Sequence, residues 1–524
     1  MTTSSLRSRA LADLDEDERY ALFDRLQDRM AGAWSVMGLN EEGESVVVVP
    51  SVTLDRVTER SGSLGQAMEE RFLFLLLLLR EPRLQMVYVT SMPIAPAVVE
   101  YYLALLPGVI PSHALARLTL VPVTDASPRP LSEKLLERPR LLARIAELVP
   151  DPSRSHLVPY TTTTLERDLA LALGIPVYGA DPRLFDLGTK TGCRRLFAEE
   201  GVRHPIGFED LHTLDDLLDA TLRLRRDRPS VRYVIVKLNE GVSGEGNAIV
   251  DMSGLPAPGS AEEPAAVADR LRRMEFERPD MPFDAYVAKL GQRGGIVEER
   301  ITGAELRSPS VQLRVLPGGL VELLSTHDQL LGGPSGQSYL GCRFPADFAY
   351  ARAISADALA VGQRLSREGV LGRFALDFVV VDDGDGSWTP YAIEINLRKG
   401  GTTHPFLTLQ FLTDGRYDGA TGLFLTQAGK EKHLVATDHL ESAALRGLSL
   451  DDLFDIVARH GLHFDQARQT GIVFHMISCL TEHGRVGLTA VGDSPAHADQ
   501  LYRRAERILL DEAANAQRSV PVRI

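Results

Sequence analysis

YAIEINLRKGG, at residues 391–401, places Glu394 and Asn396 two positions apart on an apolar strand. Side chains at this spacing in a strand point to the same face. The preceding strand pattern, GRFALDFVVVDD at residues 372–383, carries Asp377. Two carboxylates and a carboxamide are hard oxygen ligands suited to Mg²⁺ on nucleotide phosphates. An isolated E-x-N is more often only the polar face of a strand, so its interpretation depends on the surrounding motifs.

A glycine-rich segment, VIVKLNEGVSGEGNAIV at residues 234–250, lies upstream of these strands. A β-branched run ending at Lys237 meets three glycines, Gly244 and Gly246 among them, before a second apolar strand begins. Walker and dinucleotide motifs run from a strand into a helix, so this strand–flap–strand pattern is neither. Glycines let backbone N–H groups close over phosphate oxygens, to which Lys237 adds a positive charge. The alternative is an ordinary hairpin with a loose loop.

The segment GGIVEERITGAELRSPSVQLRV, residues 294–315, begins as an apolar strand and then carries the acidic residues Glu298, Glu299 and Glu305. The strand end could supply an acceptor for a purine edge, and Glu305 a carboxylate for ribose hydroxyls. Adjacent strand residues point to opposite faces, so only one of Glu298 and Glu299 can face a purine. Which of them does so stays open. Acidic residues on a strand are more often its solvent face.

Taken in order, Lys190, Lys237 before the flap, VEERI, Asp377 and E-x-N-x-R resemble the ATP-grasp superfamily across residues 180–405. Further phrases are similar to the pheganomycin-type peptide ligases, a branch of that superfamily, over nearly the whole chain. These phrases are SPSVQLRV at 308–315, LLSTHDQLLGGPSGQSYLGCRFP at 323–345, INLRKGGTTHPFLTLQFLTDG at 395–415 and FHMISCLTEHGRVGLTAVGDSP at 474–495.

The resemblance implies a set of site residues. Lys190 and Lys237 would contact phosphates, Gly244 and Gly246 would form the flap, and Arg398 would lie near the transferred phosphoryl group. The remaining implied roles are an adenine hinge at Glu298, Glu299, Arg300 and Ile301, a ribose contact at Glu305, and ligands for one or two Mg²⁺ ions at Asp377, Glu394 and Asn396. Lys237 and Arg398 would be the catalytic pair, because phosphoryl transfer needs positioning and charge neutralisation rather than a covalent nucleophile.

The function that this resemblance implies is an ATP- and Mg²⁺-dependent carboxylate–amine ligase. It would activate a small carboxylic acid, an amino-acid derivative, as an acylphosphate and transfer it to a peptide or amino-acid acceptor, giving ADP and phosphate. Such ligases act in peptide natural-product biosynthesis. Two alternatives stay open: a ligase for two small amino acids, and a nucleotide-binding sensor or scaffold without ligase activity.

Two loops are candidates for substrate contact. RKGGTTHPF at residues 398–406 follows the metal strand and combines charge, glycines and hydroxyls. In it, substrate or phosphate contacts are expected at Lys399, Gly400, Gly401, Thr402 and Thr403. A structural turn with a capping threonine would explain the same hydroxyls. In STHDQLLGGPSGQSYLG, residues 325–341, His327 or Asp328 could assist amine deprotonation.

Alternating strand and helix patterns predict an α/β and α+β multidomain protein with three parts. We expect an N-terminal α/β pre-ATP-grasp domain at residues 1–180, an ATP-grasp domain at 181–420 and a small α+β C-terminal domain at 421–524. The last part carries no self-sufficient catalytic set and is a candidate for shaping the acceptor pocket or for homodimer contacts. His475, on an apolar strand of this part, is more often a structural residue.

Composition narrows the class of protein. A chain of 524 residues that is 44% hydrophobic can bury several full cores. The formal charge of −14 argues against a nucleic-acid-binding surface. The apolar run at residues 72–79 is far shorter than the roughly twenty residues that span a membrane, so a buried helix is expected. No export signal is visible, and the three cysteines lack any C-x-x-C spacing, so we expect a cytoplasmic protein with reduced thiols.

Overall fold

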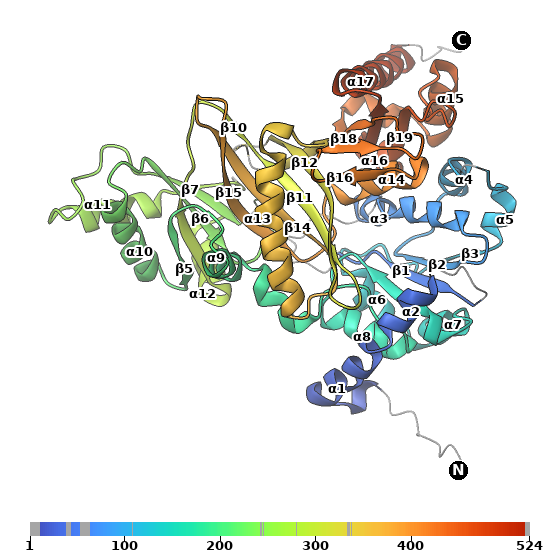
Figure 1. The fold of residues 1–524 in the computed structure, drawn as a ribbon, viewed down its shortest axis with the longest axis horizontal. Coiled ribbons are helices and arrows are strands. Elements are labelled where there is room, and N and C mark those ends of the chain that lie inside the picture. The colour runs from blue at the N-terminus through green and yellow to red at the C-terminus, as the bar shows by residue number, and fades with distance from the viewer. Residues whose placement is uncertain are drawn as a thin grey trace, which may run out of the picture.

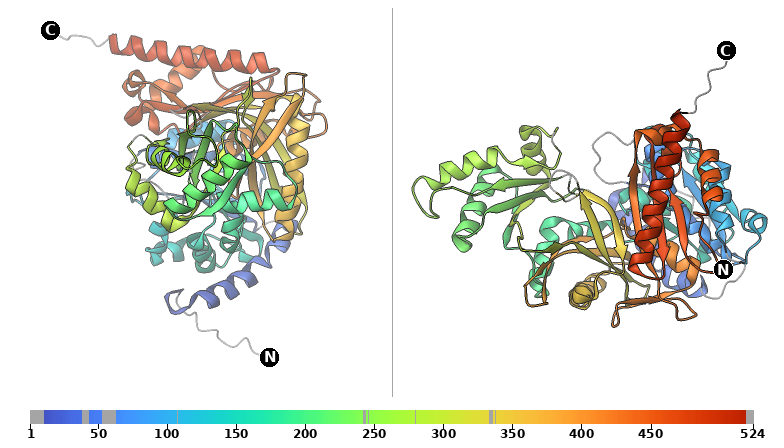
Figure 2. Two further views of the ribbon diagram at one scale, coloured as in Figure 1. Left: turned by 90° about the vertical axis from the view of Figure 1, so that its left-hand side faces the viewer. Right: turned by 90° about the horizontal axis from the view of Figure 1, so that it is seen from above.

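The computed structural model describes residues 11–37, 43–52, 63–106, 108–241, 244, 246–278, 280–332, 336 and 338–518. A five-stranded sheet with its helices forms one side of the molecule, and a nine-stranded sheet forms its centre (Figure 1). The N-terminal four-stranded sheet and the C-terminal helices lie together on the far side. Figure 2 shows the five-stranded part projecting from the rest. The predicted α/β and α+β architecture is therefore confirmed.

The N-terminal part is a parallel sheet in the order β3-β2-β1-β4. Its strands are β1 (Ser45–Val49), β2 (Gln85–Thr90), β3 (Leu118–Pro122) and β4 (Ser155–Pro159). β1 is SVVVV and is buried throughout, as expected for a parallel strand covered on both faces. The α-helices of this part are α1 (Glu16–Gln27), α2 (Met30–Met37), α3 (Ser63–Glu70), α4 (Pro96–Ala104), α5 (Pro111–Leu115), α6 (Leu131–Leu136), α7 (Pro139–Glu147) and α8 (Thr164–Leu173).

The two faces of β1 belong to two different cores. Val46 and Val48 pack in a cluster with the leucine run and α4, whereas Val47 and Val49 pack with residues of α7 and α8. The leucine run forms the 3₁₀ helix η2 (Leu73–Arg80), whose leucines are almost all buried. The prediction of a buried helical segment is thus confirmed. Shorter 3₁₀ turns are η1 (Leu11–Asp13), η3 (Pro152–Arg154), η4 (Pro182–Gly188) and η5 (Ala443–Gly447).

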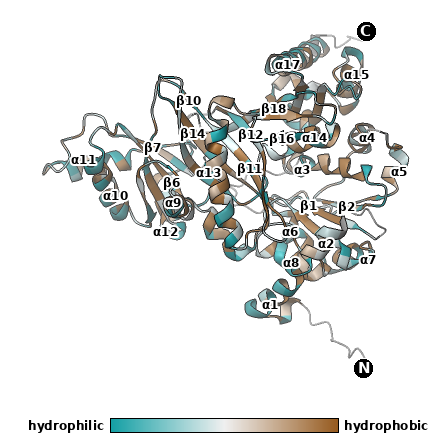
Figure 3. Ribbon diagram, viewed as in Figure 1, coloured by the Kyte–Doolittle hydropathy of each residue, from teal (hydrophilic) through white to brown (hydrophobic). Residues whose placement is uncertain are grey.

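The five-stranded sheet is antiparallel in the order β5-β9-β6-β7-β8. Its strands are β5 (Gly207–Leu211), β6 (Tyr233–Leu238), β7 (Asn247–Asp251), β8 (Glu275–Phe276) and β9 (Gly295–Glu299). Its helices are α9 (Lys190–Glu199), α10 (Leu214–Asp227), α11 (Glu263–Arg272) and α12 (Phe283–Arg293). Figure 3 shows hydrophilic colour on the outward helix α11 and apolar colour along β1 and β2, so the cores lie against the sheets.

The nine-stranded sheet runs in the order β10-β14-β11-β12-β13-β18-β20-β19, with β15 paired to β14. Its strands are β10 (Leu306–Arg307), β11 (Pro309–Val315), β12 (Val321–Gly332), β13 (Ser338–Phe344), β14 (Gly372–Asp382), β15 (Trp388–Asn396), β18 (His433–Glu441), β19 (Gly471–His475) and β20 (Arg485–Gly492). Its helices are α13 (Phe348–Arg367), α14 (Thr403–Thr413), α15 (Leu450–His460), α16 (Cys479–His483) and α17 (Pro495–Arg518). A small hairpin joins β16 (Arg416–Asp418) to β17 (Leu423–Leu425).

The C-terminal strands continue the central sheet rather than forming one of their own. β13 pairs with β18, so main-chain hydrogen bonds cross the predicted boundary at residue 420. The N-terminal part also touches this region: Tyr102 Oη donates to the carbonyl of Phe474 at 3.1 Å, inside one shared core. The predicted domain limits stay predictions. Within the described residues, no helix has the length and apolar character needed to cross a membrane.

Candidate active site

A cavity of about 520 Å³ lies where the sheets meet. Its walls come from β6 and β9, from β14 and β15, from the loop at residues 400–402, and from residues of α3, β18 and β20. The predicted site residues that line it are Lys190, Lys237, Gly244, Gly246, Glu298, Glu299, Arg300, Ile301, Asp377, Glu394, Asn396, Arg398, Gly400, Gly401 and Thr402. The structure therefore brings most of the predicted residues to one place, although their individual roles remain to be tested.

Two carboxylates face each other across β14 and β15. Asp377 pairs with Glu394 in the antiparallel register. Asp377 accepts hydrogen bonds from Asn396 Nδ2 at 3.1 Å and from Gln329 Nε2 at 3.0 Å. Burial, together with the charge of Glu394, raises the pKa of Asp377 to about 6. The pair thus carries negative charge that a hard cation would neutralise, and its oxygen donors fit Mg²⁺.

Two lysines on the cavity wall are each paired with a carboxylate. Lys190, the first residue of α9, places Nζ 2.8 Å from Glu394 Oε1. Lys237 on β6 places Nζ 2.6 Å from Glu298 Oε1. Burial alone would raise the pKa of Glu394, but the charge and hydrogen bond of Lys190 outweigh it and lower that pKa. Both ammonium groups are therefore held at the cavity, where phosphate oxygens would be attracted to them.

Glu298 and Glu299 point to opposite faces of β9, as adjacent strand residues must. Glu298 is 2% exposed, and its second oxygen lies 3.0 Å from Arg194 Nη1. Glu299 instead accepts a hydrogen bond from the backbone N–H of Ile206 at 3.2 Å. The carboxylate that accompanies Lys237 is therefore that of Glu298. The adenine-hinge role of this segment stays a prediction.

The glycine-rich segment joins the antiparallel strands β6 and β7, as expected. Gly244 has a φ of +81°, a conformation that favours glycine. The carbonyl of Gly246 accepts a hydrogen bond from the N–H of Leu238 at 3.0 Å and closes the hairpin. Residues 242, 243 and 245 of the predicted flap lie outside the described residues. The phosphate-covering role of the flap stays a prediction.

Arg398 and the loop after it form the cavity wall beside the carboxylate strands. Arg398 Nη1 donates to Tyr160 Oη at 3.3 Å. A Cβ atom added to Gly401 would lie 2.5 Å from the ring of Tyr339, so glycine is required for this approach. The loop at residues 400–402 therefore passes close to the ring and exposes its backbone to the cavity.

Three residues predicted to contact ligands do not line the cavity. The side chain of Glu305 is about half exposed and lies 2.8 Å from Arg307. Lys399 is buried, and its Nζ donates to the carbonyl of Pro159 at 2.6 Å. Thr403 Oγ1 donates to a buried glutamine side chain at 3.1 Å. Each group has a protein partner in the ligand-free structure, and the expected ligand contacts of these three residues stay predictions.

The two predicted proton acceptors both lie on β12. His327 is fully buried between the rings of Phe344 and Phe406, with centroid distances of 5.0 and 6.2 Å. Burial lowers its pKa to about 3. Asp328 accepts a hydrogen bond from Tyr350 Oη at 2.6 Å. Neither residue lines the cavity, and the role of either one in amine deprotonation stays a prediction.

Several polar residues of the cavity were missed as site residues. Gln329 lies one position after Asp328 on β12, so its side chain points to the opposite face of the strand and reaches Asp377. That alternation is a signal present in the sequence. Arg71, Asp438 and Arg485 carry no such signal. They come from three separate elements and line the cavity together.

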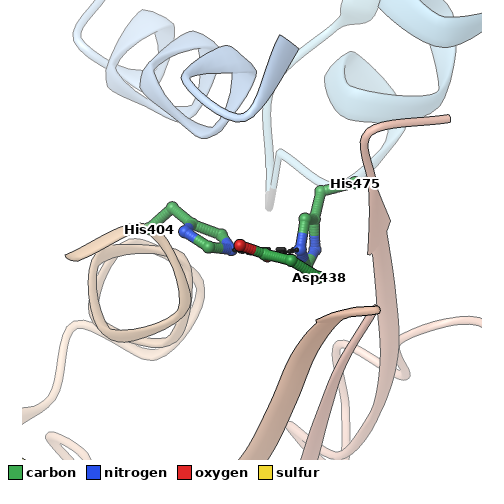
Figure 4. A group of neighbouring side chains, drawn as sticks. All are labelled: His404, Asp438 and His475. Carbon is green, nitrogen blue, oxygen red and sulfur yellow. Dashed lines mark hydrogen bonds and ion pairs between the residues drawn. The ribbon is translucent and has the colours of Figure 1, made fainter. Parts of the chain in front are cut away.

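Asp438 lies at the centre of a buried polar cluster (Figure 4). Its Oδ1 lies 2.8 Å from His475 Nε2 and 3.4 Å from His404 Nε2, and the two imidazole nitrogens are 3.1 Å apart. These ligand atoms are close enough together to hold a metal ion. Arg71 Nη2, however, lies 2.9 Å from Asp438 Oδ2 and already neutralises the carboxylate. We therefore interpret the cluster as a support for Arg71.

Two family models match the chain. The model described as IQCH-like, ATP-grasp matches residues 183–273 and 280–419, and the model of the PGM1 C-terminal domain matches residues 452–505. The chain is also 29% identical over 497 residues to the L-propargylglycine–L-glutamate ligase of Streptantibioticus cattleyicolor, covering 92% of this chain and 98% of that protein. It is 26% identical over 362 residues to IQ motif-containing protein H of Danio rerio, covering 61% of this chain and 34% of that protein.

Solved structures share the fold at low sequence identity. An ADP complex of N5-carboxyaminoimidazole ribonucleotide synthetase is 11% identical with a TM-score of 0.50, covering 90% of this chain and 98% of that one. Biotin carboxylase from Campylobacter jejuni, in a β-γ-ATP complex, is 12% identical with a TM-score of 0.51, covering 91% and 96%. These likenesses show that the fold is shared.

Proposed function

Because this chain belongs to the ATP-grasp superfamily and is a carboxylate–amine ligase, we propose that its cavity forms amide bonds through an acylphosphate. The carboxylate of the acid attacks the γ-phosphorus of ATP, and ADP leaves. The amine then attacks the acyl carbon, phosphate leaves with the bonding electrons, and the amine loses a proton. The overall products are the amide, ADP and phosphate.

The residues of the cavity match what phosphoryl transfer requires. Mg²⁺, as one or two ions, would supply charge neutralisation on the phosphates, with Asp377, Glu394 and Asn396 as its protein ligands. Lys237 and Arg398 neutralise the equatorial oxygens of the transferred group. Lys190 and Lys237 give up their present carboxylate partners for phosphate oxygens when the nucleotide enters. Residues 298–301 hold the adenine, and the glycine flap closes over the phosphates.

One observation carries this proposal. Residues from α9, β6, β14 and β15 meet on a single cavity, and each cavity lysine is already paired with a carboxylate. When Mg-ATP binds, Mg²⁺ can replace a lysine beside a carboxylate, and phosphate oxygens can replace a carboxylate beside a lysine. A purely structural ion pair would not need to line an open cavity.

The substrate class follows from the relative. That protein is named for L-propargylglycine and L-glutamate. We propose that this chain likewise joins a small acid of the amino-acid type to an amino acid or a peptide, within natural-product biosynthesis. A cytoplasmic location and a homodimer stay predictions.

The test combines the protein with Mg-ATP, L-glutamate and L-propargylglycine, and then with a panel of amino acids and short peptides. We expect ADP release that depends on both substrates, together with a product mass equal to their sum less one water. Formation of AMP and pyrophosphate, or ADP release without a condensed product, would contradict the proposal. Glu394→Gln should abolish turnover, whereas the exposed hairpin change Asp385→Asn should leave it intact.

A further inference from the structure

The cavity extends beyond the phosphate-binding residues to a second group of positive charges. Arg71 follows α3, and Arg485 begins β20; both line the cavity. Asp438 holds both of them. Its Oδ2 lies 2.9 Å from Arg71 Nη2, and its main-chain carbonyl accepts a hydrogen bond from Arg485 Nε at 2.7 Å. One aspartate thus orients two guanidinium groups at the same wall.

The donors of these arginines are not all used. Arg71 is 6% exposed, and its Nε is buried without a hydrogen-bond partner among the described residues. Its Nη1 reaches only Met68 Sδ, at 3.8 Å, a weak acceptor. Within the part of the chain that the structure describes, no carboxylate lies within 4.0 Å of Arg485, and its Nη2 donates to His439 Nε2 at 3.0 Å. A buried donor normally has a partner, so an acceptor is missing at Arg71 Nε. Arg485 is only partly buried, and its Nε and Nη2 both have protein partners.

The charge at this wall is also unbalanced. Burial lowers the pKa of His404 to about 3 and lowers that of His475, so both imidazoles are neutral. Burial opposes ionisation of Asp438, but Arg71 and then His404 hold its pKa well below the usual range. Among the groups that line the cavity here, two guanidinium groups and one carboxylate leave one positive charge. Glu441, opposite Arg485 in the β18–β20 register, is exposed and does not line the cavity. A single anion with two acceptor oxygens would neutralise it.

From these observations we propose that Arg71 and Arg485 form a carboxylate subsite, which binds a carboxylate that is not itself activated by ATP. This inference rests on the proposed ligase function and narrows its substrates to amino acids or peptides with a free carboxylate at this position. The Asp438–His404–His475 cluster is a positioning device for Arg71 (Figure 4). Phosphate is the other anion with suitable oxygens, but Lys190 and Lys237 lie at a separate part of the same cavity.

The experiment measures binding rather than turnover. The protein is saturated with Mg²⁺ and a non-hydrolysable ATP analogue, and its thermal midpoint is recorded with the twenty amino acids, L-propargylglycine and their α-carboxamides. We expect at least one free amino acid to raise the midpoint, and its amide to bind at least about tenfold more weakly, as for loss of a charge-assisted hydrogen bond. Arg485→Gln should remove the difference between acid and amide. Arg468→Gln, at a side chain that is 82% exposed, should preserve it.

Three results would overturn the subsite: equal binding of acid and amide, an undiminished preference in Arg485→Gln, or no response to any amino acid. A response to inorganic phosphate that Arg485→Gln abolishes would reassign the site to phosphate.

The comparison of acid with amide uses the unaltered protein, so it remains valid even if a variant fails to fold. If ADP release requires two amino acids, and their α-amides are equally good substrates, the ligase function is supported and the carboxylate subsite is excluded. Comparing the α-amide of each partner in turn identifies which substrate carries the bound carboxylate.

Discussion

Replacing Asp377 by Asn should make the ligand-free protein more stable at pH 8 while abolishing its activity. The pKa of Asp377 is raised from 3.8 to about 6 by burial and by Glu394. One pKa unit corresponds to about 1.36 kcal/mol, so the ionised carboxylate costs the folded protein up to about 3 kcal/mol. Since Asp377 opens onto the cavity and solvent screens it, we expect a gain of about 1 to 3 kcal/mol in Asp377→Asn.

The pH dependence has a definite sign. A carboxyl group whose folded-state pKa is raised destabilises the fold above that pKa, and the penalty fades as the pH falls towards the usual pKa. The gain from Asp377→Asn should therefore be complete at pH 8 and should shrink between pH 6 and pH 4. Its hydrogen-bond partners, Gln329 and Asn396, are both amides and can rotate to suit a carboxamide.

Thermal and urea denaturation of the ligand-free protein at pH 8 and at pH 4.5 measure this effect. Asp385→Asn is the matched control, because hydrogen bonds from Ser387 lower the pKa of Asp385, and its replacement should give no gain. A variant at Asp377 that is less stable than the parent at pH 8, or a gain that is unchanged at pH 4.5, would refute the electrostatic reasoning. Mg-ATP should stabilise the parent protein and not the Asp377 variant.

Three further predictions follow from single contacts. Lys237→Met should keep the fold, which circular dichroism measures, because Arg194 still neutralises Glu298. It should lower kcat for ADP release by about 10²- to 10³-fold, because the charge that stabilises the transferred phosphoryl group is lost. Gly401→Ala should lower kcat/KM at least about tenfold, because the added methyl group clashes with the ring of Tyr339. Adding Tyr339→Ala should recover part of this loss. If it recovers none, the clash is not the cause. His327→Leu should keep kcat near the parent value, because His327 is fully buried away from the cavity. Removal of a general base lowers kcat about 10²-fold or more, and a loss of that size would show that His327 reaches the substrate.

Local patterns predicted the catalytic strands well because strand periodicity is a local property. The two-residue spacing of Glu394 and Asn396 fixes which face they share, and the structure places them as that spacing requires. The run ending at Lys237 predicted a strand and a glycine turn for the same reason. Thr163 and Glu166 form a capping box at the start of α8, which likewise depends only on residues three positions apart.

Partners distant in the sequence could not be predicted. The local sequence around Asp438 and Arg71 has no feature that predicts their pairing, which arises only because the residue after α3 lies beside β18. His327 is a polar residue in a polar sequence context, yet it lies in an aromatic core because β12 turns that side chain inward.

The pairing of β13 with β18 restricts how the molecule can open. Because strand pairing runs unbroken from β14 to β19, the C-terminal strands β18, β19 and β20 and the central strands form one continuous sheet. The five-stranded part has a separate sheet and core of its own. We therefore expect nucleotide entry and product exit to occur by hinge movement of the five-stranded part, while the nine-stranded sheet stays in place.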